Sequence, residues 1–189
     1  RDGLRARENS GQHNLEKESW AFLWVQDEHA GKLTGLPCRV GLPEELRTRL
    51  IQVTARKVED ALFALEEGLC CHDLAFVIGE IAGNPKALDL TASRRLSLAT
   101  EKCGVPLFLV RIEAERDLSS ARMRWQVRSA PSSPPDWNSA APGTAIWHAH
   151  LFRARAHRQG EWILRDDSKH LAAIRPPAQT DLGDLADAA

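Results

Sequence analysis

The sequence predicts an α/β fold built on a mostly parallel sheet, followed by an antiparallel extension. Four apolar runs of strand length lack regular polar alternation, which is typical of strands buried on both faces. Amphipathic helical patterns separate the later runs, and strands that alternate with helices form right-handed βαβ crossovers. After residue 112 the pattern changes to alternating polar and apolar positions, which indicates antiparallel strands with one solvated face.

Length and composition are those of an ordinary globular protein. The chain has 189 residues, of which 43% are hydrophobic and 27% charged, and its formal net charge is -1. A charge this small gives no global field that would draw the protein to nucleic acid or to a membrane. No apolar run is long enough for a membrane-spanning helix, and no secretory signal stands at the start. We therefore expect a cytoplasmic protein that makes no membrane contact.

The first part of the chain contains the elements of the parallel sheet. The predicted strands are Trp20–Gln26, Arg49–Thr54, Leu74–Ile81 and Val105–Ile112. The predicted helices, each with one apolar face, are Arg56–Leu69 and Thr91–Cys103. Asp89 or Thr91 can cap the start of the second helix, and Gly104 can close its end.

The second part predicts antiparallel strands. Residues 121–129 alternate in polarity, and residues 146–157 and 161–166 predict a hairpin that turns near Gln159 and Gly160. We expect one domain over residues 19–170, a flexible lead-in over residues 1–18 and a flexible tail over residues 171–189. Because the chain begins with Arg1 rather than Met, we also expect a fragment whose natural N-terminus lies upstream.

The sequence predicts no metal site. The four cysteines, which are expected to be reduced, have no CxxC spacing; they are Cys38, Cys70, Cys71 and Cys103. His148 and His150 would share one face of a strand, but the sequence offers no evident third ligand.

A phosphate-binding loop of the form GxxxxGK[ST] occurs nowhere in the sequence. Gly31 and Lys32 are followed by Leu33, and Gln26 stands where the first glycine of such a loop belongs. The backbone N–H groups that cradle the phosphates of a nucleotide are therefore missing. We expect no cofactor, with ATP and Mg²⁺ entering only if the chain upstream of Arg1 supplies the loop.

Two predicted strands end in acidic residues. The run AFLWVQDEHA brings Asp27, Glu28 and His29 to the carboxyl end of its strand, where ligands bind in open α/β sheets. A carboxylate there could orient a water for phosphate hydrolysis, or these residues could begin a polar helix. The run LAFVIGEI carries Glu80, which could hold Mg²⁺ through water or could begin a charged loop.

Arginines accumulate in the predicted antiparallel part. Between residues 118 and 165, seven arginines stand against two acidic residues. The seven are Arg122, Arg124, Arg128, Arg153, Arg155, Arg158 and Arg165. Two guanidinium groups that leave a strand on one side, such as Arg153 and Arg155, could bind phosphates or carboxylates, or could line a solvated strand face. The tryptophans of these strands, Trp125, Trp147 and Trp162, are expected in a core rather than as base-stacking platforms.

Taken in order, these motifs resemble the RecA ATPase core over residues 20–166, which implies a three-layer RecA-like fold. Glu28 in AFLWVQDEHA matches the catalytic glutamate of that family, and Glu80 in LAFVIGEI matches the acid of its Walker B strand. SRRLSLATEKCGVPLFLVRI and SARMRWQVRSAPS resemble the elements that follow. In LFRAR, Arg153 and Arg155 fall on the Lys-x-Lys element with which RecA reaches a neighbouring subunit's nucleotide.

The sequence also departs from RecA. The segments between Ile81 and Thr91 and between Ile112 and Ala121 are short, whereas RecA carries its two DNA-binding loops at these points. Arg111 replaces the glutamine with which RecA senses nucleotide. These departures argue against filament formation and strand exchange.

Three segments are more specifically similar to the ImuA family of degenerate RecA-like proteins, and to its alphaproteobacterial members in particular. They are RKVEDALFALEEGL, LDLTASRRLSLA and ARMRWQVRSAPSSPPDW. The resemblance implies an accessory factor of the SOS response to DNA damage, acting in mutagenic translesion DNA synthesis. It implies an inactive Y-family-like partner (ImuB) and an error-prone replicative-type polymerase. RecA and single-stranded DNA are further candidate partners.

We therefore expect a non-enzymatic binding protein in which Glu28 and Glu80 are vestigial catalytic positions. Candidate residues for nucleotide or partner contact are Arg153 and Arg155; those for contact with DNA or an acidic partner are Arg122, Arg124 and Arg128. Two alternatives stay open. One is an ATPase whose P-loop precedes residue 1, and the other is a regulator that caps RecA filaments.

Overall fold

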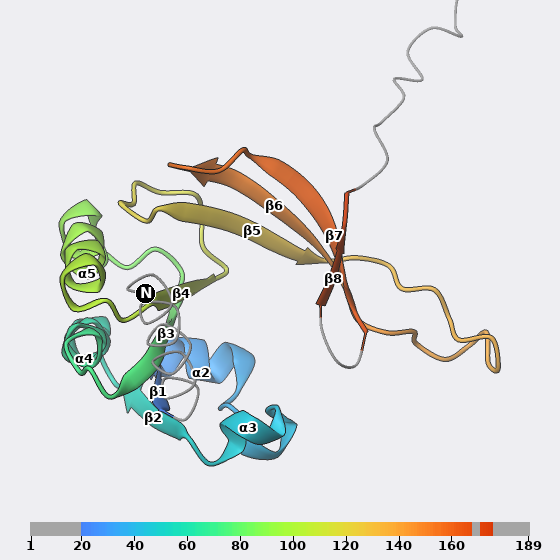
Figure 1. Cartoon of the computed structure of the whole chain (residues 1–189), viewed down its shortest axis with the longest axis horizontal. Helices are drawn as coiled ribbons and strands as arrows, with labels where there is room; N and C mark the ends of the chain where they lie inside the picture. Colours follow the sequence, from blue (N-terminus) through green and yellow to red (C-terminus); the bar gives the residue numbers. More distant parts are fainter. Residues whose placement is uncertain (1–19, 168–170, 176–189) are drawn as a thin grey trace, which may run out of the picture. The chain divides into compact units, whose positions relative to one another are not determined.

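The computed structural model describes residues 20–167 and 171–175, which form two compact units (Figure 1). The division falls between Ala121 and Arg122. The predicted lead-in over residues 1–18 lies outside the described residues, as do residues 176–189 of the predicted tail. The single domain expected over residues 19–170 stays a prediction.

The first unit contains a four-stranded parallel sheet in the order β2-β1-β3-β4. Its strands are β1 (Ala21–Asp27), β2 (Leu50–Ala55), β3 (Leu74–Ala82) and β4 (Leu107–Ile112). Each strand coincides with one of the four predicted apolar runs. The α/β fold with a mostly parallel sheet is thereby confirmed.

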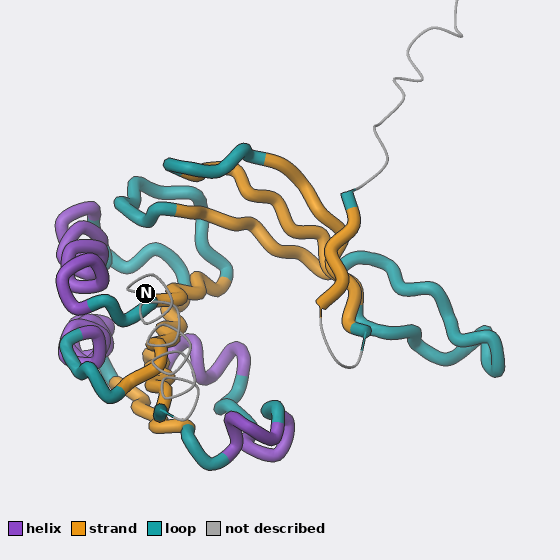
Figure 2. Tube along the Cα trace, in the orientation of Figure 1, coloured by secondary structure: helices purple, strands orange, loops and turns teal. Residues whose placement is uncertain are grey.

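Two amphipathic helices, α4 (Val58–Leu69) and α5 (Leu90–Cys103), cover one face of this sheet (Figure 2). Their buried residues Leu65 and Leu96 belong to one apolar core with Val25 of β1 and Val77 of β3. Burying such aliphatic side chains supplies the main driving force for folding. The two helices and the sheet therefore share one core.

Both predicted ends of α5 are present. The Asp89 side chain accepts a hydrogen bond from the Ala92 backbone N–H at 2.7 Å, so Asp89 rather than Thr91 is the cap. Gly104 has a φ of 72°, the left-handed conformation that glycine adopts without strain at a helix end.

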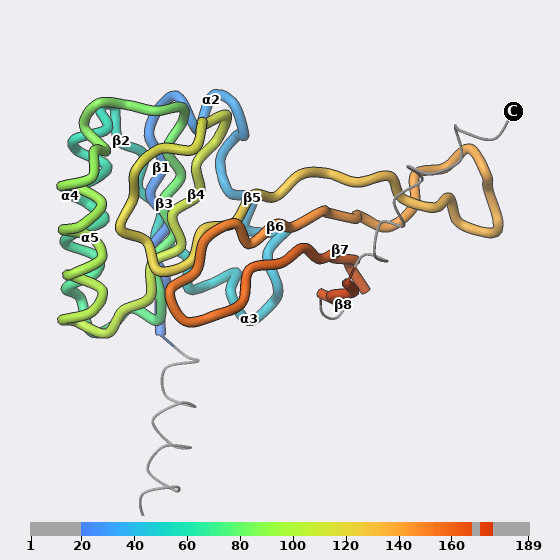
Figure 3. Tube along the Cα trace, turned by 90° about the horizontal axis from the view of Figure 1, so that it is seen from above, coloured from blue at the N-terminus to red at the C-terminus, as the bar shows by residue number. Residues whose placement is uncertain are grey.

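The segment after β1 lies on the other side of the sheet, which completes a three-layer arrangement (Figure 3). It contains α2 (Glu28–Thr34), the 3₁₀ turn η1 (Arg39–Gly41) and the single-turn helix α3 (Glu44–Arg47). The residues after β1 therefore begin a helix, as one of their two interpretations expects. The other interpretation, a carboxylate that orients a water, stays a prediction.

The second unit is a four-stranded antiparallel sheet in the order β5-β6-β7-β8. Its strands are β5 (Met123–Ser129), β6 (Ile146–Ala154), β7 (Gly160–Asp166) and β8 (Leu171–Ile174). The predicted hairpin is confirmed as β6 and β7. The last strand, β8, pairs with β7 and lies in the stretch where the sequence predicts a flexible tail.

Candidate functional site

Asp27, the last residue of β1, is used by the fold itself. Its Oδ1 accepts a hydrogen bond from the Ala30 N–H at 2.5 Å and caps the start of α2. Its Oδ2 accepts one from the Ala82 N–H at 3.4 Å. Because Asp27 is buried, these two donors compensate the loss of water around its carboxylate.

Glu80 lies at the carboxyl end of β3, where two neighbouring side chains contact it. The Gln26 side-chain amide donates to its Oε2 at 2.6 Å. The Thr34 hydroxyl lies 3.3 Å from the same oxygen, and its one proton has a nearer acceptor in the Ala30 carbonyl at 3.0 Å. The Gln26 amide also donates to the Gly35 carbonyl at 2.9 Å. Glu80 is thus tied to β1 and to the end of α2.

Sequence reasoning missed the role of Gln26. Its side chain is 1% exposed, and its register partner on β3 is Glu80. A single glutamine at the end of an apolar strand was the available signal, because a buried amide requires a polar partner. The partner itself follows only from the pairing of β1 with β3.

Glu28, the candidate water-orienting residue, is exposed at the start of α2. Its carboxylate forms an ion pair with Lys32 at 2.8 Å, one helical turn further on. The hydrogen bond and the positive charge of Lys32 lower the pKa of Glu28 below its ordinary value. Within the described part of the chain, no hydrogen bond or ion pair joins Glu28 to Glu80.

Arg111, which stands in place of a glutamine in the RecA resemblance, fastens the end of β4. Its guanidinium donates to the Gly83 carbonyl and forms an ion pair with Asp117 at 3.3 Å. Asp117 in turn accepts a hydrogen bond from the Asn84 side chain at 2.9 Å. The loops after β3 and β4 are therefore joined to each other by side chains.

A row of aromatic rings crosses the parallel sheet and ends at its open edge. The Phe22 and Phe76 rings stack with centroids 4.9 Å apart, and Phe76 meets Phe108 edge-on at 6.1 Å. Phe108 lies on the edge strand β4 and is 58% exposed, and Val110 on the same strand is also exposed. Exposed apolar side chains beside unpaired strand edges are typical of interaction surfaces.

The antiparallel sheet brings several predicted arginines together on β5 and β6 and at the residues next to them; Arg122 directly precedes β5, and Arg155 directly follows β6. Arg124 lies opposite Arg153, and the Arg155 backbone N–H donates to the Arg122 carbonyl at 3.0 Å. Arg124 also lies over the Phe152 ring at 5.1 Å. The fifth arginine, Arg128, lies further along β5, opposite a histidine of β6.

The two histidines of the HxH pair lie beside a carboxylate. His148 Nε2 is 3.1 Å from Glu161 Oε2, and His150 Nδ1 is 3.9 Å from Glu161 Oε1. In residues 20–167 and 171–175 no group of three His, Cys, Asp or Glu side chains could hold a metal ion. Glu161 of β7 therefore serves as a polar neighbour for both rings.

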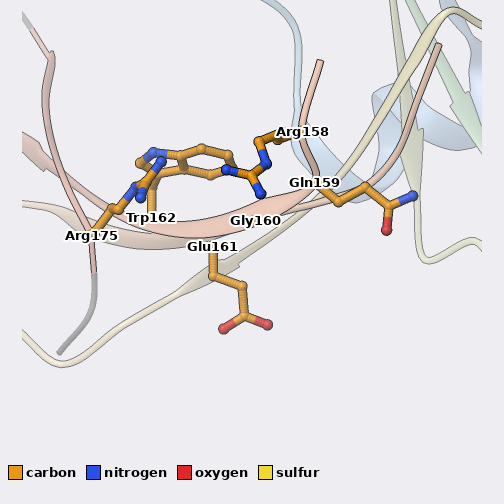
Figure 4. Close-up of a pocket in the computed structure, with 6 residues that line it drawn as sticks. All are labelled: Arg158, Gln159, Gly160, Glu161, Trp162 and Arg175. Carbon is orange, nitrogen blue, oxygen red and sulfur yellow. The ribbon is translucent and has the colours of Figure 1, made fainter. Parts of the chain in front are cut away.

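A pocket lies on the antiparallel sheet, at the start of β7 (Figure 4). Its lining residues come from the β6–β7 turn, from β7 and from the end of β8; they are Arg158, Gln159, Gly160, Glu161, Trp162 and Arg175. The side chains of Arg158, Trp162 and Arg175 lie on one side of β7, as Figure 4 shows. None of the six was predicted as a site residue.

Taken one by one, the two units define an α/β protein whose parallel sheet has acidic side chains at its carboxyl edge, and whose antiparallel sheet is rich in arginine. Two curated proteins, both named Protein ImuA and both from Caulobacter vibrioides (strains NA1000 / CB15N and ATCC 19089 / CIP 103742 / CB 15), are each 36% identical to this chain over 163 residues. Over these residues the chain is similar to the ImuA proteins.

The match covers 79% of this chain and 62% of each relative, so the chain spans less than two thirds of the length of the proteins it matches. No protein-family model matches the chain. In the part of the chain that the structure describes, no helix has the length and apolarity needed to span a membrane.

Proposed function

We propose that this chain is a non-catalytic accessory factor of SOS-induced, error-prone translesion DNA synthesis, and that it acts by binding. The observation that carries the proposal is the Gln26–Glu80 hydrogen bond at 2.6 Å. It supports a binding role because a carboxylate that already accepts a hydrogen bond from a buried amide is poorly placed to serve a metal-bound nucleotide. The similarity to the ImuA proteins supports the same role.

We further propose that the protein partners are an ImuB-like protein and an error-prone polymerase. The candidate contact surface is the β4 edge, which offers unpaired backbone groups next to exposed Phe108 and Val110. A partner strand or loop could bury these side chains and satisfy the backbone groups together. Aromatic side chains at such positions often carry a large share of the binding free energy.

DNA is proposed as a second, weaker partner. The described residues of the antiparallel unit carry eight arginines and no lysine against four carboxylates. The candidates Arg122, Arg124, Arg128, Arg153 and Arg155 belong to this set. Because phosphate contacts release counterions, such binding should weaken steeply as salt is raised.

Binding of the natural full-length protein to the ImuB-like protein of the same cell, measured by calorimetry, tests the proposal. Replacing Phe108 with serine should weaken that binding by about tenfold, because a central aromatic contact is lost. Phe63→Ser is the matched control, since Phe63 is equally exposed but lies on α4. Unchanged affinity of the Phe108 variant would remove β4 as the contact surface, and absence of any binding by the parent protein would remove the accessory role.

A further inference from the structure

The pocket on β7 is built around the indole of Trp162. A Cβ added at Gly160 would lie 3.0 Å from the far edge of that indole, so the ring lies along the strand directly over the glycine. A Cβ at position 160 would therefore require the ring to shift by a few tenths of an ångström. Gly160 therefore allows the indole to lie along the sheet, so that its outer side faces the pocket.

Two guanidinium groups flank this ring. Figure 4 shows the indole between the side chains of Arg158 and Arg175, whereas Glu161 points away on the opposite side of β7. Within residues 20–167 and 171–175, neither Arg158 nor Arg175 forms an ion pair. Two cations without a protein counter-ion attract an anionic ligand to this side of the sheet.

A second indole extends the platform. The Trp125 and Trp162 ring centroids are 5.3 Å apart, and Trp125 is 46% exposed. The register places both rings on one face of the sheet. Val127 and Trp162 both lie opposite Ala149, and Trp125 shares the face of Val127 because the two residues are two positions apart on β5. The predicted core position is therefore wrong for Trp125, because this side chain is exposed.

We propose that Trp162, flanked by Arg158 and Arg175, is a stacking platform for an unpaired base of single-stranded nucleic acid. A base would lie against the indole while the phosphates on either side of it meet the two guanidinium groups. Aromatic rings combined with a positively charged groove are the general means of binding single strands without sequence preference. A duplex does not fit this chemistry, since its bases are already stacked on one another.

This inference rests on the DNA contact in the proposed function and assigns it a site. The five arginines proposed above reach only phosphates, which a duplex offers as readily as a single strand. The Trp162 platform adds contact with the base itself. It therefore predicts a preference for single strands over duplexes that a purely electrostatic surface lacks.

The test measures binding of the full-length protein to a fluorescently labelled oligo-dT by anisotropy. Trp162→Leu should weaken binding by about tenfold, the loss expected for one base–aromatic stack. The matched control is Trp137→Leu, because Trp137 is 80% exposed on the β5–β6 loop and lies outside the pocket. Arg158→Gln with Arg175→Gln should also weaken binding, whereas Arg94→Gln on α5 should not.

An oligomer of the same length that carries abasic sites separates base stacking from charge. Trp162→Leu and the parent should bind the abasic oligomer equally, because it retains the phosphates and lacks the bases. Gly160→Ala keeps the indole but displaces it, so it should weaken oligo-dT binding even if Trp162→Leu fails to fold.

The outcomes are distinct. If the parent binds oligo-dT and both Trp162→Leu and Gly160→Ala bind it equally well, the platform is overturned while the wider DNA contact stands. If the parent does not bind oligo-dT, the platform and the wider DNA contact are both overturned. Binding of the ImuB-like protein, measured separately, decides the protein-partner part of the proposed function.

Discussion

The side-chain amide of Gln26 lies 2.6 Å from the Glu80 carboxylate, across the junction of β1 and β3 at the carboxyl edge of the parallel sheet. The two residues are far apart in sequence but direct neighbours in the strand register. The acid that resembles a Walker B residue is therefore part of an internal hydrogen-bond network. That network also reaches α2 through Thr34 and Gly35.

The Gln26–Glu80 pair should contribute measurably to stability. Each single replacement, Gln26→Leu and Glu80→Leu, and the double replacement should be compared by urea unfolding. We expect a coupling free energy of about 1.5–3 kcal/mol, the net value of a hydrogen bond to a charged group. A coupling indistinguishable from zero would mean that the pair does not hold the sheet edge together.

The pKa of Glu28 should depend on Lys32. In the folded protein this pKa lies below its ordinary value. The ion pair therefore stabilises the protein fully at pH values above the ordinary pKa, and this stabilisation is lost as the pH falls through the folded pKa. Replacing Lys32 with methionine should raise the pKa of Glu28 in an NMR titration. Lys86→Met, a change on an exposed lysine that does not contribute to the shift, should leave the pKa of Glu28 unchanged. An unchanged pKa in both variants would refute the interaction.

Cys70 and Cys103 should influence each other's reactivity. Their Sγ atoms are 3.5 Å apart, and the hydrogen bond between them raises the pKa of Cys70 above its ordinary value. Because the thiolate is the reactive form, Cys103→Ala should speed alkylation of Cys70 by iodoacetamide at mildly alkaline pH. Peptide mass spectrometry measures the rate, with Cys38→Ala as the control. Equal rates in the parent and in Cys103→Ala would contradict the prediction.

Gly79 should tolerate no side chain. A Cβ at this position of β3 would lie 2.9 Å from Leu65 of α4 and 3.1 Å from Leu109 of β4. Gly79→Ala should therefore lower the free energy of unfolding by about 1–3 kcal/mol through overpacking. Gly41→Ala is the control, since its nearest neighbour would be 4.0 Å away. Equal stability of the two variants would show that the helix layer adjusts without cost.

Local signals predicted most of the fold. Asp89 and Gly104 fixed the ends of α5 because a cap and a left-handed glycine act within one helical turn. The strand β8 was missed because the short run Leu171–Ile174 carries no alternation, and its order depends on pairing with β7. Such pairing is a property of the folded sheet.

The candidate sites were less predictable than the fold. Glu80 was found from its place at the end of a strand, but its contact with Gln26 depends on which strands are neighbours. The sequence predicts a core position for Trp162, and the structure has this residue half-buried, because alternation alone does not tell which face of a sheet is covered. Its contact with Gly160 and its place between Arg158 and Arg175 needed the register of β7 and β8.

The measurement that tests the binding account most directly is nucleotide turnover by the natural full-length protein, measured as phosphate release in the presence of single-stranded DNA. Glu28→Gln and the double replacement Arg153→Ala with Arg155→Ala serve as comparisons. The account predicts that DNA or the partner protein is bound and that no variant changes phosphate release from background. Turnover by the parent that Glu28→Gln abolishes would contradict it and would establish a working ATPase.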